Sequence, residues 1–273
     1  MPGPCKDGSD GTGRSTVSLY TSACRPSRQE QQMAGRNLKQ RIGAGEQIIG
    51  ANVGMTHTLD QLKKVVESGQ FDFLWVDGQH SAFSEERLVA FCDKADTVDA
   101  DVVFRIKHTY HSYLVGNLLD LGPAGIEVPQ VETEGTVEEA VDFFYYPQQG
   151  MRSWGGGARR KVSEVGDDRL QYAAWWNNYG VLMIQLESIP AVTGARTLAI
   201  AGVDCLSFGP NDLMYSIEAH PHHPFRDVDD CVRHVVDQLE DSETMVCFRN
   251  HAREDRGKYV DMGVTVFLES PDL

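Results

Sequence analysis

Hydrophobic and polar positions follow a repeating pattern in which a short apolar run is followed by a longer amphipathic segment. The apolar runs predict strands at residues 47–52, 71–77, 101–106, 125–129, 181–187, 203–209, 245–249 and 264–268. Apolar residues at helical spacing predict helices at residues 37–41, 58–68, 84–95, 113–121, 136–144, 190–201, 228–239 and 253–262. About eight strands separated by helices are typical of an α/β fold, the parallel (β/α)8 TIM barrel. The pattern ends with the last strand, so the usual final helix is not predicted.

Two segments depart from this alternation. Residues 1–34 are polar and show no sustained periodicity, which predicts a disordered leader before a single barrel domain at residues 35–273. The pattern lapses again at about residues 147–180, where we expect an irregular, lid-like insertion. Three glycines at 155–157 leave a phosphate-binding loop as the alternative, although they lack the surrounding residues of a known phosphate-binding motif.

Composition narrows the function classes. The chain has 273 residues and is 41% hydrophobic, which is enough for a large buried core. No apolar run approaches the roughly 18 residues that span a membrane, and the N-terminal residues lack the apolar segment of a secretory signal. We therefore expect a cytoplasmic protein without a membrane partner. The formal net charge of -15 argues against a nucleic-acid partner, because such binding depends on clustered Lys and Arg.

Two successive predicted strands end in carboxylates. The strand at 181–187 ends in Gln185 and Glu187, and the strand at 203–209 is followed by Pro210, Asn211 and Asp212. Barrel enzymes place their chemistry at the C-terminal ends of the strands, so Glu187 and Asp212 should share one site. Two carboxylates suffice for a hard divalent cation such as Mg²⁺, which keeps water or substrate oxygens in its other positions. In the alternative interpretation, Glu187 begins a helix and Asp212 caps one.

Other strand ends on the same rim carry reactive side chains. His80 follows the second strand and could act as a general base near neutral pH, oriented by Asp77 three residues earlier. Arg105 ends the third strand and could clamp a carboxylate or stabilise an enolate oxygen. A buried structural histidine and a salt bridge at the barrel rim are the alternatives. Asp120 lies within a predicted helix, and the pattern alone assigns it no role.

Six segments together resemble the HpcH/HpaI aldolase family: FDFLWVDGQHS, FRI, LLDLGPAGIEVPQVET, YPQQGMRSWGGGARR, VLMIQLES and GVDCLSFGPNDL, in this order. The resemblance implies a class II, metal-dependent aldolase on a TIM barrel of the phosphoenolpyruvate/pyruvate type. Such an enzyme cleaves 4-hydroxy-2-oxo acids to pyruvate, or a related 2-oxo acid, and an aldehyde. The reaction passes through an enolate bound to a divalent metal (Mg²⁺, Mn²⁺ or Co²⁺). The resemblance also implies a homo-oligomer that acts on small molecules.

Carried over by position, the resemblance assigns roles to ten residues. Glu187 and Asp212 match the metal ligands. The predicted substrate-binding residues are Gln185, Gly209, Pro210 and Asn211, and the predicted catalytic residues are His80, Asp77, Arg105 and Asp120. The family commonly has a glutamate where this chain has Gln79, so an amide replaces a charge beside His80.

Other functions use the same barrel. An oxaloacetate decarboxylase of the macrophomate synthase-like kind would keep the enolate chemistry. A CoA-ester lyase would need a basic surface for the CoA phosphates, for which the sequence offers Arg152, Arg159, Arg160 and Lys161. A catalytically silent barrel that serves as a binding subunit is the alternative of another class.

Overall fold

The computed structural model describes residues 35–155, 160–250 and 253–272. The chain from Arg36 onward forms one compact unit. The predicted leader at residues 1–34 lies outside the described residues, as do Gly156, Gly157 and Arg159.

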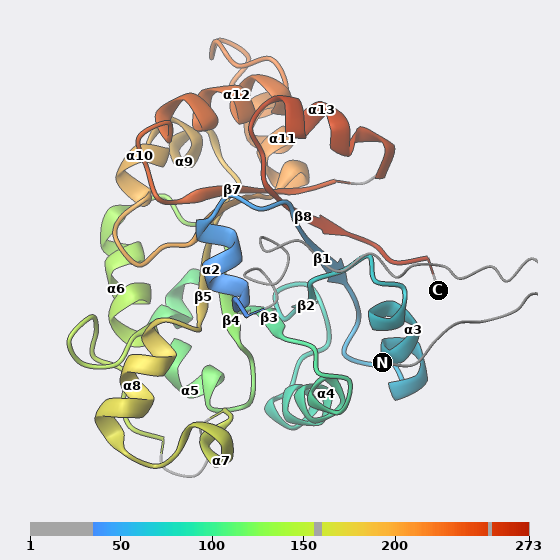
Figure 1. Cartoon of the computed structure of the whole chain (residues 1–273). Helices are drawn as coiled ribbons and strands as arrows, with labels where there is room; N and C mark the ends of the chain where they lie inside the picture. Colours follow the sequence, from blue (N-terminus) through green and yellow to red (C-terminus); the bar gives the residue numbers. More distant parts are fainter. Residues whose placement is uncertain (1–34, 156–159, 251–252, 273) are drawn as a thin grey trace, which may run out of the picture. The chain divides into compact units, whose positions relative to one another are not determined.

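Eight parallel strands close into a barrel in chain order, which confirms the predicted TIM barrel (Figure 1). The strands are β1 (Ile48–Asn52), β2 (Phe73–Asp77), β3 (Val102–Arg105), β4 (Gly125–Val128), β5 (Val181–Leu186), β6 (Cys205–Phe208), β7 (Met245–Arg249) and β8 (Val266–Glu269). Each strand pairs with its sequence neighbours, and β8 pairs with β1. The register places the last residues of β2 and β3, Asp77 and Arg105, directly opposite each other.

Helices connect the strands around the outside of the barrel (Figure 1). They are α2 (Leu38–Gly43), α3 (Leu59–Glu67), α4 (Glu85–Thr97), α5 (Val115–Leu119), α6 (Glu134–Phe144), α7 (Val162–Val165), α8 (Arg169–Asn177), α9 (Ile189–Thr193), α10 (Ala195–Leu198), α11 (Pro210–Ala219), α12 (Val228–Gln238) and α13 (Arg256–Asp261), with the short 3₁₀ helices η1 (Thr109–Leu114) and η3 (Arg253–Asp255). None of these described helices is both long and apolar enough to cross a membrane. The described residues that follow β8, 270–272, are not helical.

Local side-chain hydrogen bonds explain where several helices begin. Thr58 and Gln61 form a reciprocal capping box at the start of α3. The hydroxyl of Ser84 accepts from the backbone N–H of Arg87 at 3.3 Å, so Ser84 is the N-cap of α4. Pro210 lies in the first turn of α11, where a missing N–H costs no helical hydrogen bond. The Gly-Pro break in the sequence therefore starts a helix that the hydrophobic pattern did not predict.

The segment at residues 147–180 is not irregular throughout, and that prediction is wrong where α7 and α8 form. Tyr172 and Trp176 of α8 are fully buried. The indole N–H of Trp176 donates to the carbonyl of Phe144 in α6 at 3.0 Å, which ties α8 to the outside of the barrel. Helix α8 was not predicted from the sequence because its aromatic, polar and charged residues do not separate into an apolar face and a polar face.

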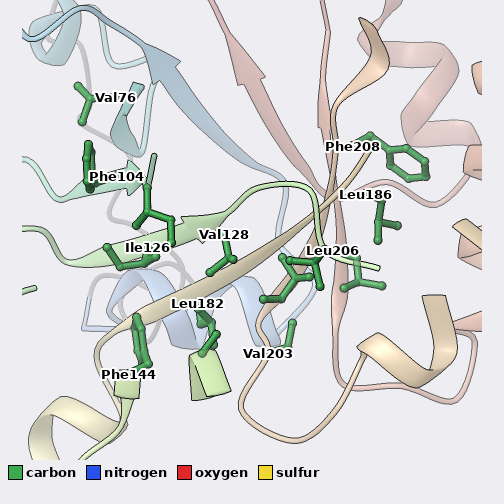
Figure 2. Close-up of a cluster of buried hydrophobic side chains, with 14 of the residues drawn as sticks. Val76, Phe104, Ile126, Val128, Phe144, Leu182, Leu186, Val203, Leu206 and Phe208 are labelled. Carbon is green, nitrogen blue, oxygen red and sulfur yellow. The ribbon is translucent and has the colours of Figure 1, made fainter. Parts of the chain in front are cut away.

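Alternate strand residues point outward and pack beneath the helices. Figure 2 shows part of this layer, in which Val76, Phe104, Ile126 and Leu182 from successive strands lie among other buried apolar side chains, with Phe144 from α6. Each such side chain contributes roughly 1.5–3 kcal/mol through burial. This layer holds the barrel strands and their helices together.

The other set of strand residues points into the barrel, and α2 closes its N-terminal end. Leu38 and Ile42 of α2 pack with inward residues such as Val181 and Cys205. In Figure 1, α2, drawn in blue, lies across the strands. Inward positions are therefore apolar at the N-terminal end of the barrel, whereas polar residues gather at the other end.

Lys39 anchors α2 through an ion pair. Its Nζ donates to Asp204 Oδ1 at 2.6 Å and to the hydroxyl of Tyr145 at 2.8 Å. Burial raises the pKa of the Asp204 carboxyl, against the opposing charge and hydrogen bond of Lys39. Beside this ion pair lies a cleft of about 770 Å³, lined in part by Asn178 and Glu243. The cleft is at the N-terminal end of the barrel, away from the C-terminal strand ends that carry most of the predicted site residues.

We expect Lys39→Met to lower the free energy of unfolding by about 2–4 kcal/mol, because it leaves the half-buried Asp204 carboxylate without its cation. Urea unfolding at neutral pH measures this change. The matched control is Lys63→Met, since Lys63 is exposed and lies 4.0 Å from Asp60. It should cost less than about 0.5 kcal/mol. Equal losses in the two variants would contradict the anchoring role of Lys39.

Candidate active site

Polar side chains at or just after the C-terminal ends of β2, β3, β5 and β6 lie at one mouth of the barrel. Asp77 ends β2, Arg105 ends β3, and Gln185 lies near the end of β5. Glu187 follows β5 directly, and Asp212 lies in the first turn of α11 after β6. Parallel strands all end on the same side of a barrel, so one rim carries these predicted site residues.

Arg105 is the most connected of them. Its Nε donates to Asp77 Oδ1 at 2.8 Å, and its Nη1 donates to Gln185 Oε1 at 3.2 Å. The same Nη1 lies 3.9 Å from Glu187 Oε1. Burial by itself would raise the pKa of the Asp77 carboxyl. The hydrogen bond and the positive charge of Arg105 outweigh this effect, so the pKa of Asp77 lies below its ordinary value. The guanidinium is therefore held at three points, one at the end of β2 and two at the end of β5.

Glu187 is buried and faces a second carboxylate. Its Oε2 accepts from the backbone N–H of Gln130 at 3.0 Å. The pKa of Glu187 is raised from 4.5 to about 7, mainly because the carboxyl is buried. The positive charge of Arg105 lowers this pKa, and the negative charge of Asp212 raises it further. Asp212 itself is exposed. Two carboxylates that repel each other in this way are what a bound cation would neutralise.

Gly209 allows the backbone to approach these groups closely. A Cβ at this position would lie 2.6 Å from Glu187 Oε1 and 2.8 Å from Gln185 Nε2. Any larger residue would displace one or both side chains. The amide Nε2 of Gln185 is buried and has no hydrogen-bond partner among the described residues. This unused donor near the Glu187 carboxylate suits a ligand that presents oxygen atoms.

The donor set fits a hard divalent cation that keeps several of its own waters. The described residues contain no group of three or more His, Cys, Asp or Glu side chains placed to hold a metal. Mg²⁺ does not need such a group, because it is commonly bound through one or two carboxylates with water and substrate oxygens completing the shell. Glu187 and Asp212 provide this number of carboxylates.

The structure does not show the predicted side-chain contact between Asp77 and His80. Asp77 instead accepts from the backbone N–H of Gln79 at 2.8 Å and of His80 at 3.2 Å. His80 is exposed beside the mouth. Asp77 therefore shapes the turn that carries His80 and holds Arg105, and a general-base role for His80 stays a prediction.

Asp120 does not join the rim. Helix α5 runs back from the end of β3 towards the start of β4, so its C-cap, Asp120, lies at the N-terminal end of the barrel. There Asp120 Oδ1 accepts from Arg152 Nη2 at 2.6 Å. A helix that returns antiparallel to its strand therefore places Asp120 away from the rim of its own barrel, and a catalytic role for Asp120 stays a prediction.

Two of the basic residues considered for binding CoA phosphates, Arg152 and Arg160, are buried and paired with carboxylates. The side chain of Arg152 is fully buried and pairs with Asp120. Arg160 is also buried, and it pairs with Asp96 at 2.9 Å and with Asp101 at 3.0 Å. Arg159 lies outside the described residues. Arg152 and Arg160 are therefore not available to bind phosphates.

A polar layer directly below the rim was not predicted from the sequence. Glu127 in β4 is fully buried and accepts from Ser207 Oγ at 2.5 Å, from Trp75 Nε1 at 2.8 Å and from Arg249 Nη2 at 3.3 Å. A glutamate inside an apolar strand run was the available signal, since a charge at such a position needs a partner. The identity of that partner depends on how the barrel closes.

We expect Glu187→Gln to stabilise the metal-free protein at alkaline pH. The folded pKa of Glu187, about 7, exceeds its ordinary 4.5, so the native state retains a proton that the unfolded state loses. Stability should therefore fall as the pH rises from about 4.5 to about 7, and the variant should avoid a loss of about 3 kcal/mol. Urea unfolding with a chelator at pH 5 and pH 8 tests this. A difference between parent and variant that is the same at both pH values would contradict it.

Sequence and structure comparisons agree on one family. The family model described as HpcH/HpaI aldolase/citrate lyase matches residues 57–267. A hydroxypyruvate/pyruvate aldolase of Chromohalobacter salexigens is 28% identical over 216 residues, which cover 77% of this chain and 82% of that protein. A 5-keto-4-deoxy-D-glucarate aldolase of Shigella boydii is 26% identical over 206 residues, which cover 74% and 78%. The crystal structure of an HpcH/HpaI aldolase from Desulfitobacterium hafniense DCB-2 has a TM-score of 0.74 at 25% identity and covers 87% of this chain and 91% of that chain. The chain belongs to the HpcH/HpaI aldolase/citrate lyase family.

Proposed function

We propose that this protein is a divalent-metal-dependent aldolase that cleaves 4-hydroxy-2-oxo acids to pyruvate, or a related 2-oxo acid, and an aldehyde. The observation that carries the proposal is the fixed Arg105 guanidinium beside Gln185 and Glu187 at the barrel mouth. The relatives named as a hydroxypyruvate/pyruvate aldolase and a 5-keto-4-deoxy-D-glucarate aldolase support a reaction of 2-oxo acids.

Glu187 and Asp212 are the residues that would hold the metal. A divalent cation supplies Lewis acidity towards the carboxylate and keto oxygens of a 2-oxo acid. The buried position of Glu187 keeps one of these carboxylates away from bulk water, while the exposed Asp212 leaves a side open to solvent and substrate.

Arg105 and Gln185 would bind the developing negative charge. The two hydrogen bonds of Arg105 to Asp77 and Gln185 fix the plane of its guanidinium before substrate arrives. A donor that is already oriented stabilises an enolate oxygen without reorganisation. The free Nε2 of Gln185 would donate to a second substrate oxygen.

His80 would act as the general base of the cleavage step. Its exposed imidazole stands on the turn after β2, next to the mouth. It would accept the proton of the 4-hydroxyl group, directly or through water, as the aldehyde leaves.

Proton NMR of pyruvate in heavy water tests the enolisation step without the unknown aldehyde. With Mg²⁺, Mn²⁺ or Co²⁺, the methyl signal should disappear by exchange, and a chelator should stop the loss. Absence of exchange with every metal would exclude the proposed aldolase chemistry.

We expect Asp212→Asn to lower the metal-dependent exchange rate by at least ~100-fold, because an amide removes one of two charges at the metal pair. The matched control is Asp60→Asn, an exposed carboxylate on α3, and it should exchange like the parent protein. Circular dichroism checks that both variants are folded. Full activity of Asp212→Asn would remove this residue from the metal site.

We expect Arg105→Lys to lower the exchange rate by about 100-fold, because an ammonium cannot replace the planar fork that joins Asp77 to Gln185. Arg233→Lys, at an exposed pair with Asp230, is the control with the same chemical change. A near-normal rate in Arg105→Lys would reduce Arg105 to a structural salt bridge.

A further inference from the structure

A second arginine, Arg249, enters the mouth of the barrel from the end of β7. Met245 and Cys247, its neighbours at two-residue spacing, belong to the inward-facing cluster, and Arg249 continues this inward series. Its guanidinium crosses the barrel to reach Glu127 on β4, which is not a neighbour of β7. Arg249 therefore lies within the barrel, at the same end as Arg105.

The two arginines share one aromatic ring. The guanidinium carbon of Arg249 lies 4.0 Å from the centre of the Trp75 ring, and that of Arg105 lies 5.1 Å from it. Trp75 is itself fixed, because it is buried and donates from Nε1 to Glu127. The ring limits how far either guanidinium can turn.

Arg249 is held at one edge and open at the other. Its Nη2 donates to Glu127 at 3.3 Å, and this is the guanidinium's one hydrogen bond to a described residue. The side chain is 15% exposed, so its remaining donors reach the solvent of the mouth. The end of β7 is also braced, since the adjacent Asn250 donates to Glu269 of β8 at 2.8 Å.

The balance of charge around the two arginines is unequal. Arg105 has Asp77 at 2.8 Å and Glu187 at 3.9 Å, whereas within the described part of the chain Arg249 forms one ion pair, with Glu127 at 3.3 Å. Burial lowers the pKa of Arg249 and the nearby charge of Arg105 lowers it further, against the opposing pull of Glu127. Two neighbouring cations with spare donors are a site for an anion.

We propose that Arg249 is a specificity-determining residue that binds a carboxylate of the substrate other than the one beside the keto group. This inference rests on the proposed aldolase function and deepens it. A carboxylate matches the planar fork of a guanidinium with two parallel hydrogen bonds, and the free edge of Arg249 offers such a fork. The second carboxylate belongs either to the 2-oxo acid or to the aldehyde, and both present the same group.

Two matched substrate pairs test the proposal and separate these sources. For the oxo acid, proton exchange at C3 of 2-oxoglutarate is compared with that of 2-oxobutyrate, which lacks the second carboxylate. For the aldehyde, addition of pyruvate to glyoxylate is compared with addition to glycolaldehyde. The readout is the ratio of kcat/KM within each pair, because general damage to the barrel lowers both members together.

We expect the parent protein to prefer the carboxylate-bearing member of one pair, and Arg249→Gln to lower that ratio by about 10–100-fold. Arg249→Lys should recover part of the ratio, because it keeps the charge without the fork. The control Arg233→Gln removes an exposed arginine and should leave the ratio as in the parent.

Arg249→Gln leaves the buried Glu127 carboxylate without its cation, which could destabilise the protein. A second variant therefore separates a loss of specificity from a loss of folding. The double variant Glu127→Gln and Arg249→Gln removes both charges together and should show the same fall in the ratio. An unchanged ratio in these variants, or a parent without preference in either pair, overturns the role of Arg249. Exchange of the pyruvate methyl group in the parent separates that result from failure of the aldolase proposal, which would overturn both.

Discussion

A carboxylate in the centre of a closed barrel has to be neutralised by its neighbours, and the mouth of this barrel is built around that requirement. Glu127 is fully buried, and its two oxygens take hydrogen bonds from β2, β6 and β7. Removing a carboxylate from water costs several kcal/mol, and the three contacts together offset this cost. Loss of any one of them would therefore weaken the support for Glu127. The indole of Trp75, fixed in this way, becomes the surface on which two guanidinium groups lie.

The chemistry proposed above depends on this support rather than on the rim residues alone. Arg105 is bound at its edge by Asp77 and Gln185 and lies over Trp75. Its donors therefore keep one orientation before substrate enters, which is the condition under which hydrogen bonds stabilise a transition state more than a ground state. Glu187 lies beside it, buried enough to raise its pKa yet within reach of Asp212. The proposed cation site and the proposed anion site are thus adjacent at one mouth.

Much of this arrangement could be predicted from the sequence, for reasons that are physical. The eight strands are nearly continuous apolar runs, because strands buried on both faces allow little else. Residues such as Glu187 and Arg105 stand at the ends of those runs, where parallel strands bring their side chains to one rim. Helix α8 was not predicted, because tertiary contacts of Trp176 rather than a local pattern stabilise it. The pairing of Glu127 with Arg249 joins strands that are not neighbours, and only the closed barrel brings them together.

The ion pair at the other end of the barrel has a consequence for how the chain is made. Lys39 and Asp204 are separated by 165 positions, so α2 cannot reach its partner until the first five strands have left the ribosome and β6 begins to follow. At typical rates of synthesis, about 5–20 residues per second, the helix waits for roughly 10–30 s. During that time Leu38 and Ile42 have no barrel interior to cover, and they are exposed to solvent and to other proteins. The N-terminal end of the barrel is thus closed late in synthesis, and the apolar face of α2 stays uncovered until the strands that it packs against have formed.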